Sequence, residues 1–354
     1  MKKTILFLTF ILPFLWINNV LAQDMPFTNY IVRDIASGRI FEEKASNIRV
    51  LPASTTKITT AIVAIENADL KDVFTVGEEI LTMDGANIYV EMNEHILFQD
   101  LLYGMILRSG NDAAMTIAKN VSGSVPNFVR LMNEKARSLK MTNTIFNNPT
   151  GLDDYEKNYT TMYDLSTIYS YAYQNETFRK VVSTKSYSSE SDKKSYYFNN
   201  RLEFLKLYDK ATGGKTGYTP DAGRLLVTSA SNKDLDIVIA THGNTYGYPY
   251  HKQKYEEIFS LYKNYLILDK ENLNITSPLE GKLYIKNSFS YPLTKEEFKN
   301  LKKEVVFNNH QKDVVGVINI YLDNNLIHKE NIYLKTSNNS WFHKVLDFFK
   351  KLTC

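Results

Sequence analysis

The stretch that decides the fold of this chain is Pro52-Ala53-Ser54-Thr55-Thr56-Lys57. It opens a predicted helix, because the apolar residues that follow are spaced to form one buried helical face: Ile58, Ala61, Ile62 and Ile65. Lys57 stands one helical turn beyond Ser54, so the two side chains share a face and can reach each other. A serine hydroxyl becomes a good nucleophile at neutral pH only beside a base, and a lysine amine can be that base. Considered alone, however, Ser54 is most simply the N-cap of an ordinary helix.

Two further short motifs follow in order, Ser109-Gly110-Asn111 and Lys215-Thr216-Gly217. Each is weak by itself: Ser-x-x-Lys also begins at Ser191 and Ser260, a Ser-Gly-Asn alone is a turn, and an isolated lysine is most often solvated. Their co-occurrence in this order supplies a serine nucleophile, a base, a polar group between them and a second lysine. That set is typical of penicillin-recognising acyl-transfer enzymes.

The N-terminus is typical of a secretory signal. Lys2 and Lys3 are followed by a short apolar stretch over residues 5–17, and Val20-Leu21-Ala22 offers a cleavage site. The apolar stretch is interrupted by Pro13 and is too short to span the roughly 30 Å of a bilayer core. We therefore expect residues 1–22 to be removed as a signal peptide.

Composition limits the remaining possibilities. The chain has 354 residues with 44% hydrophobic and 23% charged side chains, which are ordinary globular values. A formal net charge of only +3 gives no indication of a nucleic-acid partner. The single cysteine, Cys354, cannot form an internal disulfide, so the fold must rest on its hydrophobic core.

The segments between the motifs are predicted to form an antiparallel sheet and a helical subdomain. Strands are expected at 29–34 and 40–43 as a hairpin, and at 224–230 and 235–241. Helical periodicity predicts an α-helical subdomain over about 85–175, with helices at 98–106, 112–119, 125–139 and 160–173, and a later helix over 250–266. The serine- and lysine-rich segment 183–195 is expected to be a solvated hairpin or loop.

The last third of the chain differs from the rest. Strand-like runs at 282–286, 304–307, 314–321 and 327–334 predict a small β-rich domain over 269–336, with a hairpin turn at Asp323-Asn324-Asn325. Residues 337–354 end in a short amphipathic helix, Trp341–Thr353, whose aromatic face and basic face are typical of a helix lying in a membrane interface. The alternative is a helix packed on the β-rich domain.

These motifs and their flanks resemble those of the serine-type D-Ala-D-Ala carboxypeptidases, the low-molecular-mass penicillin-binding proteins. The resemblance covers about residues 27–266, and its parts beyond the first motif are Asp100-Leu101-Leu102-Tyr103-Gly104 before Ser109-Gly110-Asn111-Asp112-Ala113, Asn148-Pro149-Thr150-Gly151-Leu152, and Gly214-Lys215-Thr216-Gly217-Tyr218-Thr219 with Ala222-Gly223. It implies an α+β fold with a β-lactamase/transpeptidase-like catalytic domain over 23–268, built from an antiparallel sheet and a helical subdomain. It also implies the C-terminal β-rich domain and the terminal amphipathic membrane anchor.

The resemblance assigns a role to each site residue. Ser54 would be the nucleophile, Lys57 its base with a pKa lowered by burial near Lys215, and Ser109 the proton relay to the leaving D-alanine. Substrate would be held by Asn111, Lys215, Thr216, Gly217 and Tyr218. The glycine would let substrate approach an edge strand, and the backbone N–H groups of Ser54 and Tyr218 would form an oxyanion hole.

The implied reaction removes the terminal D-alanine from peptidoglycan pentapeptides without a cofactor or a metal ion. β-Lactams would acylate the same serine, and the enzyme would act on the periplasmic side of the cytoplasmic membrane, held by peripheral contact of its terminal helix. Three alternatives remain open: a β-lactamase, a D,D-endopeptidase, and an inactive membrane-bound scaffold. The class A β-lactamases add a glutamate for deacylation. Glu156 is the nearest candidate, and Thr160 stands where the accompanying asparagine would be expected.

Three features depart from the family pattern. Thr55-Thr56 and Ile58-Thr59 make the first helix more polar than expected, and Arg224 stands where an aromatic residue is common. Asn308-Asn309-His310 replaces an Ala-Pro stretch in the β-rich domain. The first two lie beside the predicted site and could change substrate preference.

Overall fold

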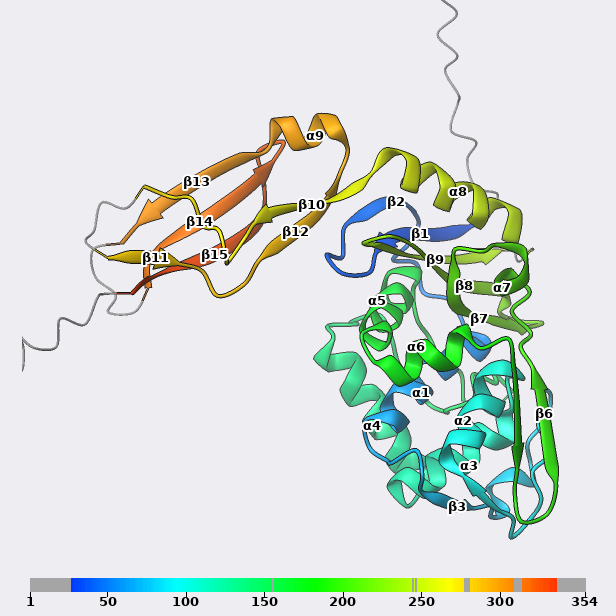
Figure 1. Cartoon of the computed structure of the whole chain (residues 1–354). Helices are drawn as coiled ribbons and strands as arrows, with labels where there is room; N and C mark the ends of the chain where they lie inside the picture. The colour runs from blue at the N-terminus through cyan, green and yellow to red at the C-terminus, as the bar shows by residue number, and fades with distance from the viewer. Residues whose placement is uncertain are drawn as a thin grey trace, which may run out of the picture.

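The computed structural model describes residues 27–335, apart from 155, 244, 246, 277–280 and 309–313. These residues form two bodies, an N-terminal domain of mixed helices and strands and a C-terminal domain made mainly of strands (Figure 1). The predicted signal peptide, the terminal amphipathic helix and Cys354 lie outside the described residues. Among the helices that are described, none is both long and apolar enough to cross a membrane.

The N-terminal domain is organised around a five-stranded antiparallel sheet in the order β2-β1-β9-β8-β7. Its strands are β1 (Asn29–Asp34), β2 (Ile40–Lys44), β7 (Ala211–Thr219), β8 (Gly223–Asn232) and β9 (Leu235–Gly243). The predicted 29–34/40–43 hairpin and the two strands after the Lys-Thr-Gly motif are confirmed. The motif itself lies on β7, which is an edge strand of this sheet among the described residues.

Helices cover both faces of this sheet (Figure 1). Alternation along β9 shows why: Val238 and Ala240 belong to the core shared with the helical subdomain, whereas Ile237 and Ile239 belong to a core on the opposite face. The first face carries α1 (Lys57–Ile65), α2 (Phe98–Leu107), α3 (Asn111–Ser122), α4 (Val125–Ser138), α5 (Met162–Tyr173) and α6 (Glu176–Ser183). The second carries α7 (Phe204–Leu207) and α8 (Tyr248–Leu261). The four predicted helices of the subdomain are confirmed as α2–α5, and α6 is an addition to them.

Smaller elements complete the N-terminal domain. A 3-10 turn, η1 (Ala53–Thr56), precedes α1, and another, η2 (Glu78–Ile80), lies between β3 (Val73–Thr75) and β4 (His95–Leu97). The hairpin expected over 183–195 is present as β5 (Ser186–Glu190) paired with β6 (Ser195–Asn199), which lies alongside α2. It is only partly solvated, because Tyr196 and Phe198 of β6 are buried in the core.

The C-terminal domain contains β10 (Lys263–Leu268), β11 (Lys282–Tyr284), β12 (Phe289–Leu293), α9 (Lys295–Asn300), β13 (Lys302–Phe307), β14 (Val314–Leu322) and β15 (Asn325–Lys335). Its larger sheet has the order β11-β15-β14-β13, and β10 pairs with β12. The predicted hairpin turn is present, with Asp323 and Asn324 both at positive φ, as a two-residue turn of this type requires.

Two features of this part of the chain differ from the prediction. The helix predicted over 250–266 ends at Leu261, and residues 263–268 form a strand instead. The helical spacing of apolar residues continues past Leu261, but residues 263–268 pair with β12 and form β10 instead. The unpredicted helix α9 starts at a capping box formed by Thr294 and Glu297.

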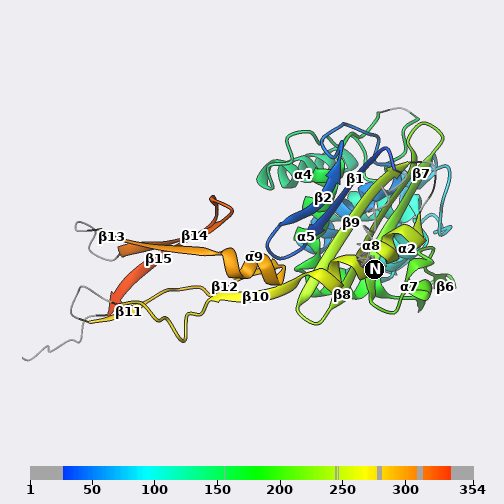
Figure 2. The same ribbon diagram turned by 90° about the horizontal axis from the view of Figure 1, so that it is seen from above.

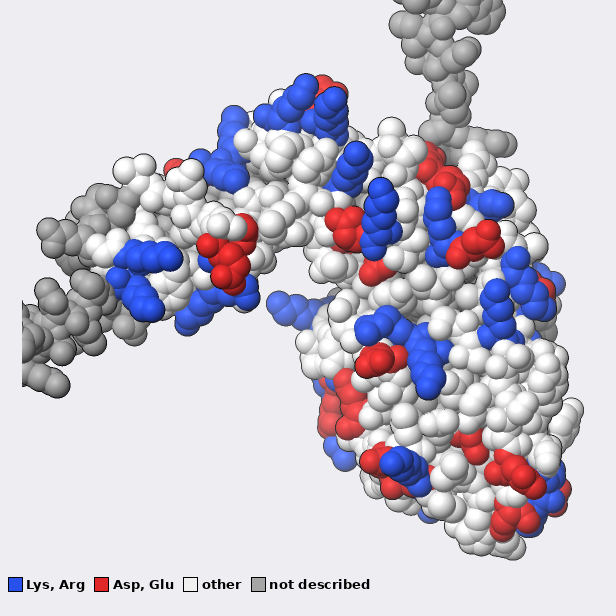
Figure 3. All heavy atoms as spheres, viewed as in Figure 1, with Lys and Arg blue, Asp and Glu red and all other residues white. Residues whose placement is uncertain are grey.

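Arg39, in the turn between β1 and β2, connects the two domains. Its guanidinium donates to both carboxylate oxygens of Glu297, at 3.2 and 2.5 Å, and to the carbonyl oxygen of Pro292 at 2.6 Å. The same group stacks on Tyr262 and Tyr291. From above, the C-terminal domain extends to one side of the N-terminal domain (Figure 2). On the face shown in Figure 3, acidic and basic side chains are interspersed over the N-terminal domain.

Candidate active site

Ser54 lies on η1, at the turn that leads into α1. The preceding residue, Ala53, has φ 46°, a left-handed conformation that is unfavourable for a residue with a Cβ. Neighbouring segments hold this turn: a Cβ at Gly151 would lie 1.8 Å from the carbonyl oxygen of Ala53, so only glycine fits there. The side chain of Ser54 caps no backbone N–H group of either helix. The simple N-cap interpretation is therefore wrong.

Lys57 is fully buried directly behind Ser54. Its Nζ lies 3.2 Å from Oγ of Ser54 and donates to Oδ1 of Asn111 and to the carbonyl oxygen of Thr150, both at 2.7 Å. A neutral amine has two N–H donors and one lone pair. Because Asn111 and Thr150 take both donors, the lone pair of a neutral Lys57 faces the Ser54 hydroxyl.

The surroundings of Lys57 favour this neutral form. Burial, followed by the charge of Lys215, lowers the pKa of Lys57 well below its ordinary value, and Arg201 acts in the same direction. Asp112 opposes this shift, but its carboxylate accepts backbone N–H groups of residues 88–90. The position and the lowered pKa of Lys57 are those that its predicted role as a base requires.

The second motif forms the wall opposite β7. Ser109 has a left-handed backbone conformation, with φ 66°. Asn111 is held from three directions: its Oδ1 accepts from Lys57, its Nδ2 donates to the carbonyl of Asp84 at 2.7 Å, and its backbone N–H donates to Ala86 at 2.7 Å. Both residues are almost fully buried, so their orientation is fixed before any ligand binds.

Lys215 brings the third motif into contact with the second. Its Nζ donates to Oγ of Ser109 at 3.1 Å and to the carbonyl oxygen of Thr216 at 2.9 Å. Burial, and secondly the charge of Arg201, lowers the pKa of Lys215 to about 7. Its amine is therefore readily switched between the charged and neutral forms near neutral pH.

Gly217 packs closely against the turn that contains Ser54, with little room for a side chain. A Cβ at this position would lie 3.0 Å from the carbonyl oxygen of Pro52 and 3.2 Å from the backbone nitrogen of Thr55. The sequence argument explained this glycine by the approach of substrate, whereas the structure shows that it lets β7 lie close to η1. Thr216 and Tyr218, on either side, line the cavity beside Ser54.

These residues enclose a cavity of about 380 Å³. Of the predicted site residues, its lining includes Ser54, Ser109, Asn111, Thr216, Gly217 and Tyr218, while Lys57 and Lys215 contact it from behind. No described carboxylate lines this cavity. Glu156, the candidate deacylation glutamate of a β-lactamase, instead lines a separate neighbouring pocket.

Sequence reasoning missed several residues of the cavity. Gly85, Ala86 and Arg201 line it, and none of them belongs to a motif singled out from the sequence. Leu152 and the carbonyl of Thr150 come from the family-like stretch after Asn148, for which the sequence suggested no role. Arg201 lies two residues beyond β6, and a basic residue after a predicted hairpin carries no signal that it will line a cavity together with a distant serine.

The residues that depart from the family pattern make simple contacts in the structure. Thr55 donates to the carbonyl of Pro52 at 2.6 Å, and Thr56 accepts from Asn158 at 3.1 Å, so both buried hydroxyls are satisfied. Arg224 lies 4.9 Å from the ring centre of Tyr218 at the mouth of the cavity. Most of the Asn308-Asn309-His310 stretch lies outside the described residues.

Comparison with known proteins agrees with this geometry. Residues 18–245 match the family described as D-alanyl-D-alanine carboxypeptidase, and residues 266–339 match the penicillin-binding protein 5 C-terminal domain. The fold and the site together define a penicillin-binding protein with a serine peptidase domain. The chain belongs to the D-alanyl-D-alanine carboxypeptidase family.

Individual relatives support the same assignment. The chain is 33% identical to D-alanyl-D-alanine carboxypeptidase DacF of Bacillus subtilis over 229 residues, which are 63% of this chain and 58% of the relative. It is 26% identical to DacA of Escherichia coli over 91% of this chain and 86% of the relative. A solved D-alanyl-D-alanine carboxypeptidase of Mycobacterium tuberculosis superposes with a TM-score of 0.64 at 31% identity, covering 67% of this chain and 92% of that one. Penicillin-binding protein 5 of Haemophilus influenzae has a TM-score of 0.75 at 24% identity over 88% and 97% of the two chains, which shows the shared two-domain fold.

Proposed function

We propose that this protein is a serine-type D-Ala-D-Ala carboxypeptidase that removes the terminal D-alanine from peptidoglycan pentapeptides. The observation that carries the proposal is the set of contacts made by Nζ of Lys57. In the neutral amine, Asn111 and Thr150 accept its two N–H donors, and its lone pair faces Oγ of Ser54 at 3.2 Å. A buried neutral amine in this position can take the serine proton as the hydroxyl attacks the substrate carbonyl.

The other side chains complete the reaction. Lys215 and Thr216 bind the substrate's terminal carboxylate, and Asn111 binds its peptide backbone. The N–H groups of Ser54 and Tyr218 stabilise the oxyanion. Ser109, which accepts from Lys215, passes a proton to the departing D-alanine. Water then hydrolyses the acyl-enzyme, and no metal or cofactor enters these steps.

The cavity lining favours a carboxypeptidase over a β-lactamase. Rapid hydrolysis of a penicilloyl-enzyme in the class A β-lactamases uses a glutamate near the ester. Among the described residues no carboxylate lines the cavity, so penicillin should remain on Ser54 as a long-lived adduct. The intact contact between Lys57 and Ser54 argues against an inactive scaffold.

The test is to incubate the protein with a synthetic pentapeptide ending in D-Ala-D-Ala and, separately, with benzylpenicillin. We expect free D-alanine in the first reaction and a penicilloyl adduct on Ser54 by mass spectrometry in the second. Ser54→Ala should abolish both. Release of D-alanine by Ser54→Ala, or an adduct mapped to another residue, would refute the mechanism.

We further propose that the protein works on the outer side of the cytoplasmic membrane. The support is the sequence pattern of residues 1–22 and the amphipathic pattern of Trp341–Thr353. A chain truncated before Trp341 should move from the membrane fraction to the soluble fraction. If the truncated chain stays membrane-bound, the terminal segment is not the tether.

A further inference from the structure

Residues 150–153, here called the linking segment, contact three separate parts of the catalytic site. The carbonyl oxygen of Thr150 accepts from Nζ of Lys57 at 2.7 Å. Gly151 packs on the turn that contains Ser54, so closely that a Cβ would lie 1.8 Å from the carbonyl oxygen of the residue before that serine. The third contact, made by the last residue of the segment, is with β7. The proposed mechanism assigns no role to this third contact.

Asp153 makes the contact with β7. Its Oδ2 accepts from the hydroxyl of Thr219 at 2.5 Å, and the same hydroxyl accepts the backbone N–H of Ala222 at 3.0 Å. A threonine hydroxyl has a single proton to donate, and here Asp153 receives it. Hydrogen bonds to a carboxylate are roughly twice as strong as those between neutral groups. The end of β7 and the turn after it are therefore fastened to the linking segment.

The linking segment is itself held in place by two asparagine side chains. Oδ1 of Asn148 accepts the backbone N–H of Gly151 at 2.7 Å, and its Nδ2 donates to the carbonyl oxygen of Leu152 at 2.9 Å. Nδ2 of Asn158 donates to Oγ1 of Thr56, in the 3-10 turn before α1, at 3.1 Å. The segment thus has a fixed position relative to the nucleophile, and β7 is fastened to a fixed support.

The position of this hydrogen bond along β7 indicates what it does. Among the described residues, β8 is the one strand that pairs with β7, so the other edge of β7 depends on different contacts. Gly217 packs on the turn of Ser54, and Thr219 is held by Asp153. Tyr218 lies between these two points, and its side chain, 52% exposed, adds little packing of its own. The distance between its backbone N–H and Ser54 therefore depends on both neighbours.

A second link joins the same two parts of the chain but contributes less. Nζ of Lys157 lies 2.7 Å from Oδ2 of Asp221, in the turn between β7 and β8, and the two side chains are 37% and 61% exposed. Ion pairs with this much exposure stabilise a fold very little. The partly buried hydrogen bond between Asp153 and Thr219 is therefore the main connection.

We propose that Asp153 is a positioning residue, which holds the end of β7 so that the backbone N–H of Tyr218 stays where it can bind the oxyanion on Ser54. Asp153 does not line the catalytic cavity, so it acts through Thr219 and not on the substrate. This inference rests on the proposed function, in which the N–H groups of Ser54 and Tyr218 stabilise the oxyanion, and adds a residue to it.

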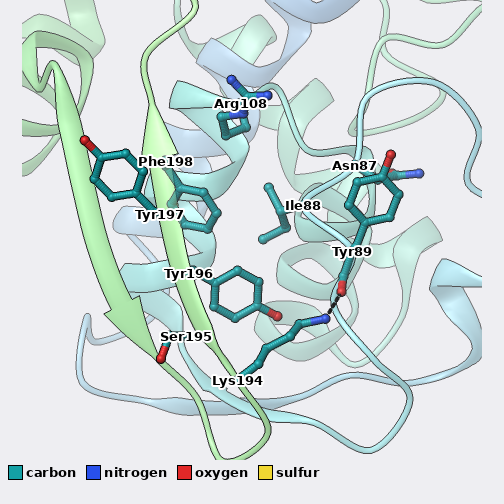
Figure 4. Close-up of a pocket in the computed structure, with 9 residues that line it drawn as sticks. All are labelled: Asn87, Ile88, Tyr89, Arg108, Lys194, Ser195, Tyr196, Tyr197 and Phe198. Atoms are coloured by element: carbon teal, nitrogen blue, oxygen red, sulfur yellow. Dashed lines mark hydrogen bonds between the residues drawn. The ribbon is translucent and has the colours of Figure 1, made fainter.

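The other side of the cavity provides a control. Residues 87–89 follow Gly85 and Ala86 of the cavity lining and form one wall of a separate pocket (Figure 4). In that pocket Lys194 donates to the carbonyl oxygen of Tyr89, which also joins two distant segments (Figure 4). Neither segment belongs to β7 or to the linking segment. Loss of the Lys194 contact should therefore leave the oxyanion-binding groups in place.

The test measures acylation of the full-length protein by benzylpenicillin in stopped-flow experiments, which separate the Kd of the initial complex from the acylation rate constant. A second measurement is the affinity for a D-alanyl boronic acid, whose tetrahedral adduct with a serine places an oxygen in the oxyanion-binding position. Asp153→Ala and Thr219→Val remove the hydrogen bond, whereas Asp153→Asn and Thr219→Ser keep an acceptor and a donor. The controls are Lys194→Met and Lys157→Gln.

Removing one oxyanion donor costs about 10²- to 10³-fold in rate, and displacing one should cost less. Asp153→Ala and Thr219→Val should therefore each lower the acylation rate constant by about tenfold and weaken the boronic acid by a similar factor. The Kd of the initial complex should change by less than about twofold. The double variant should be no slower than the slower single variant, because both lose the same hydrogen bond. Asp153→Asn, Thr219→Ser and both controls should stay within about threefold of wild type.

An unchanged acylation rate constant in Asp153→Ala refutes the inference. A loss that appears in the Kd of the initial complex instead, losses that multiply in the double variant, or an Asp153→Asn variant as slow as Asp153→Ala also refute it. If Asp153→Ala does not fold, as urea unfolding would show, the comparison of Thr219→Val with Thr219→Ser decides by the same criteria. A wild-type protein that benzylpenicillin does not acylate refutes the proposed function, and the inference with it.

Discussion

The catalytic cavity and the contact between α8 and β2 each contain a buried lysine, and the two lysines have opposite properties. Lys57 is fully buried and contacts only neutral groups, Ser54, Asn111 and Thr150. Lys254, 4% exposed, forms ion pairs with Glu42 at 2.7 Å and Glu257 at 2.8 Å.

The pKa values follow from these partners. Burial lowers the pKa of both amines, but at Lys254 the hydrogen bonds and charges of Glu257 and Glu42 outweigh burial and raise it above the ordinary value. At Lys57 the charge of Lys215 adds to burial, and the pKa falls. Burial alone therefore does not lower the pKa of a lysine in this protein. The pKa falls where burial is combined with neutral hydrogen-bond partners and a second cation.

The largest expected effect comes from removing the amine of Lys57, which has no carboxylate partner. Lys57→Met keeps the volume and the apolar stem but leaves Ser54 without a base, so acylation by benzylpenicillin should slow by about 10³-fold or more. The matched control is Lys254→Met, which should leave the acylation rate nearly unchanged and lower stability instead. Stopped-flow acylation kinetics and urea unfolding measure the two effects. Comparable acylation losses in both variants would contradict the distinction between the two lysines.

The next prediction concerns a substitution that gives Lys57 a carboxylate partner like those of Lys254. Asn111→Asp places a carboxylate where Oδ1 now lies 2.7 Å from Nζ of Lys57, so the catalytic lysine acquires a partner like that of Lys254. The pKa of Lys57 should rise, and the rising limb of the acylation pH profile should move upward by about one to three pH units. A variant that is slower at every pH without displacement of this limb would show only the loss of substrate contacts.

A smaller effect concerns Lys215, whose pKa lies at about 7. The free enzyme needs Lys57 neutral and Lys215 charged, which predicts a bell-shaped profile of kcat/KM against pH. Above pH 7 Lys215 loses the proton that pairs with the substrate carboxylate, so kcat/KM should fall roughly tenfold per pH unit. An amide-capped substrate without that carboxylate should lack the descending limb. A descending limb of equal steepness for both substrates would assign it to another group.

The smallest effect tests the paired lysine through stability. Burial would raise the pKa of Glu42, but hydrogen bonds from Lys254 and Tyr30 lower it below its ordinary value. A lowered carboxyl pKa stabilises the fold above the unfolded-state value of about 4.3, and this contribution disappears as pH falls through the folded-state pKa. Glu42→Gln should therefore cost about 1 kcal/mol at pH 7, a modest figure because Glu42 is only partly buried. Urea unfolding at pH 7 and pH 3.5 should show this difference shrinking. A constant difference would mean that ion pairing is not its origin.

Local sequence patterns predicted the helices and the side-chain contacts that depend on the spacing of nearby residues. Helical periodicity located α2–α5, and the three-residue interval placed Lys57 beside Ser54. The same reasoning extended the last helix of the domain past Leu261, because it could not include the pairing of β10 with β12. Helix α9 was missed although its capping residues, Thr294 and Glu297, are visible in the sequence.

The parts of the site that sequence did not predict depend on contacts between distant segments. The backbone carbonyl of Thr150 accepts a hydrogen bond from Lys57, and no pattern of side chains in the sequence predicts this contact. Arg201 lowers the pKa values of both catalytic-site lysines, yet it comes from the end of a surface hairpin. The sequence argument related Gly217 only to the approach of substrate, and its close packing against Pro52 emerges only from the fold.

The most direct test of the central claim is the charge of Lys57 itself. Protein labelled with ¹³C at lysine Cε can be titrated by NMR, with the signals of Lys57, Lys215 and Lys254 assigned from the spectra of the three Lys→Met variants. The account predicts that Lys57 shows the chemical shift of a neutral amine at pH 7, while Lys254 remains charged up to at least about pH 10. A Lys57 signal that stays in the charged form until about pH 10 would contradict the assignment of this lysine as the base.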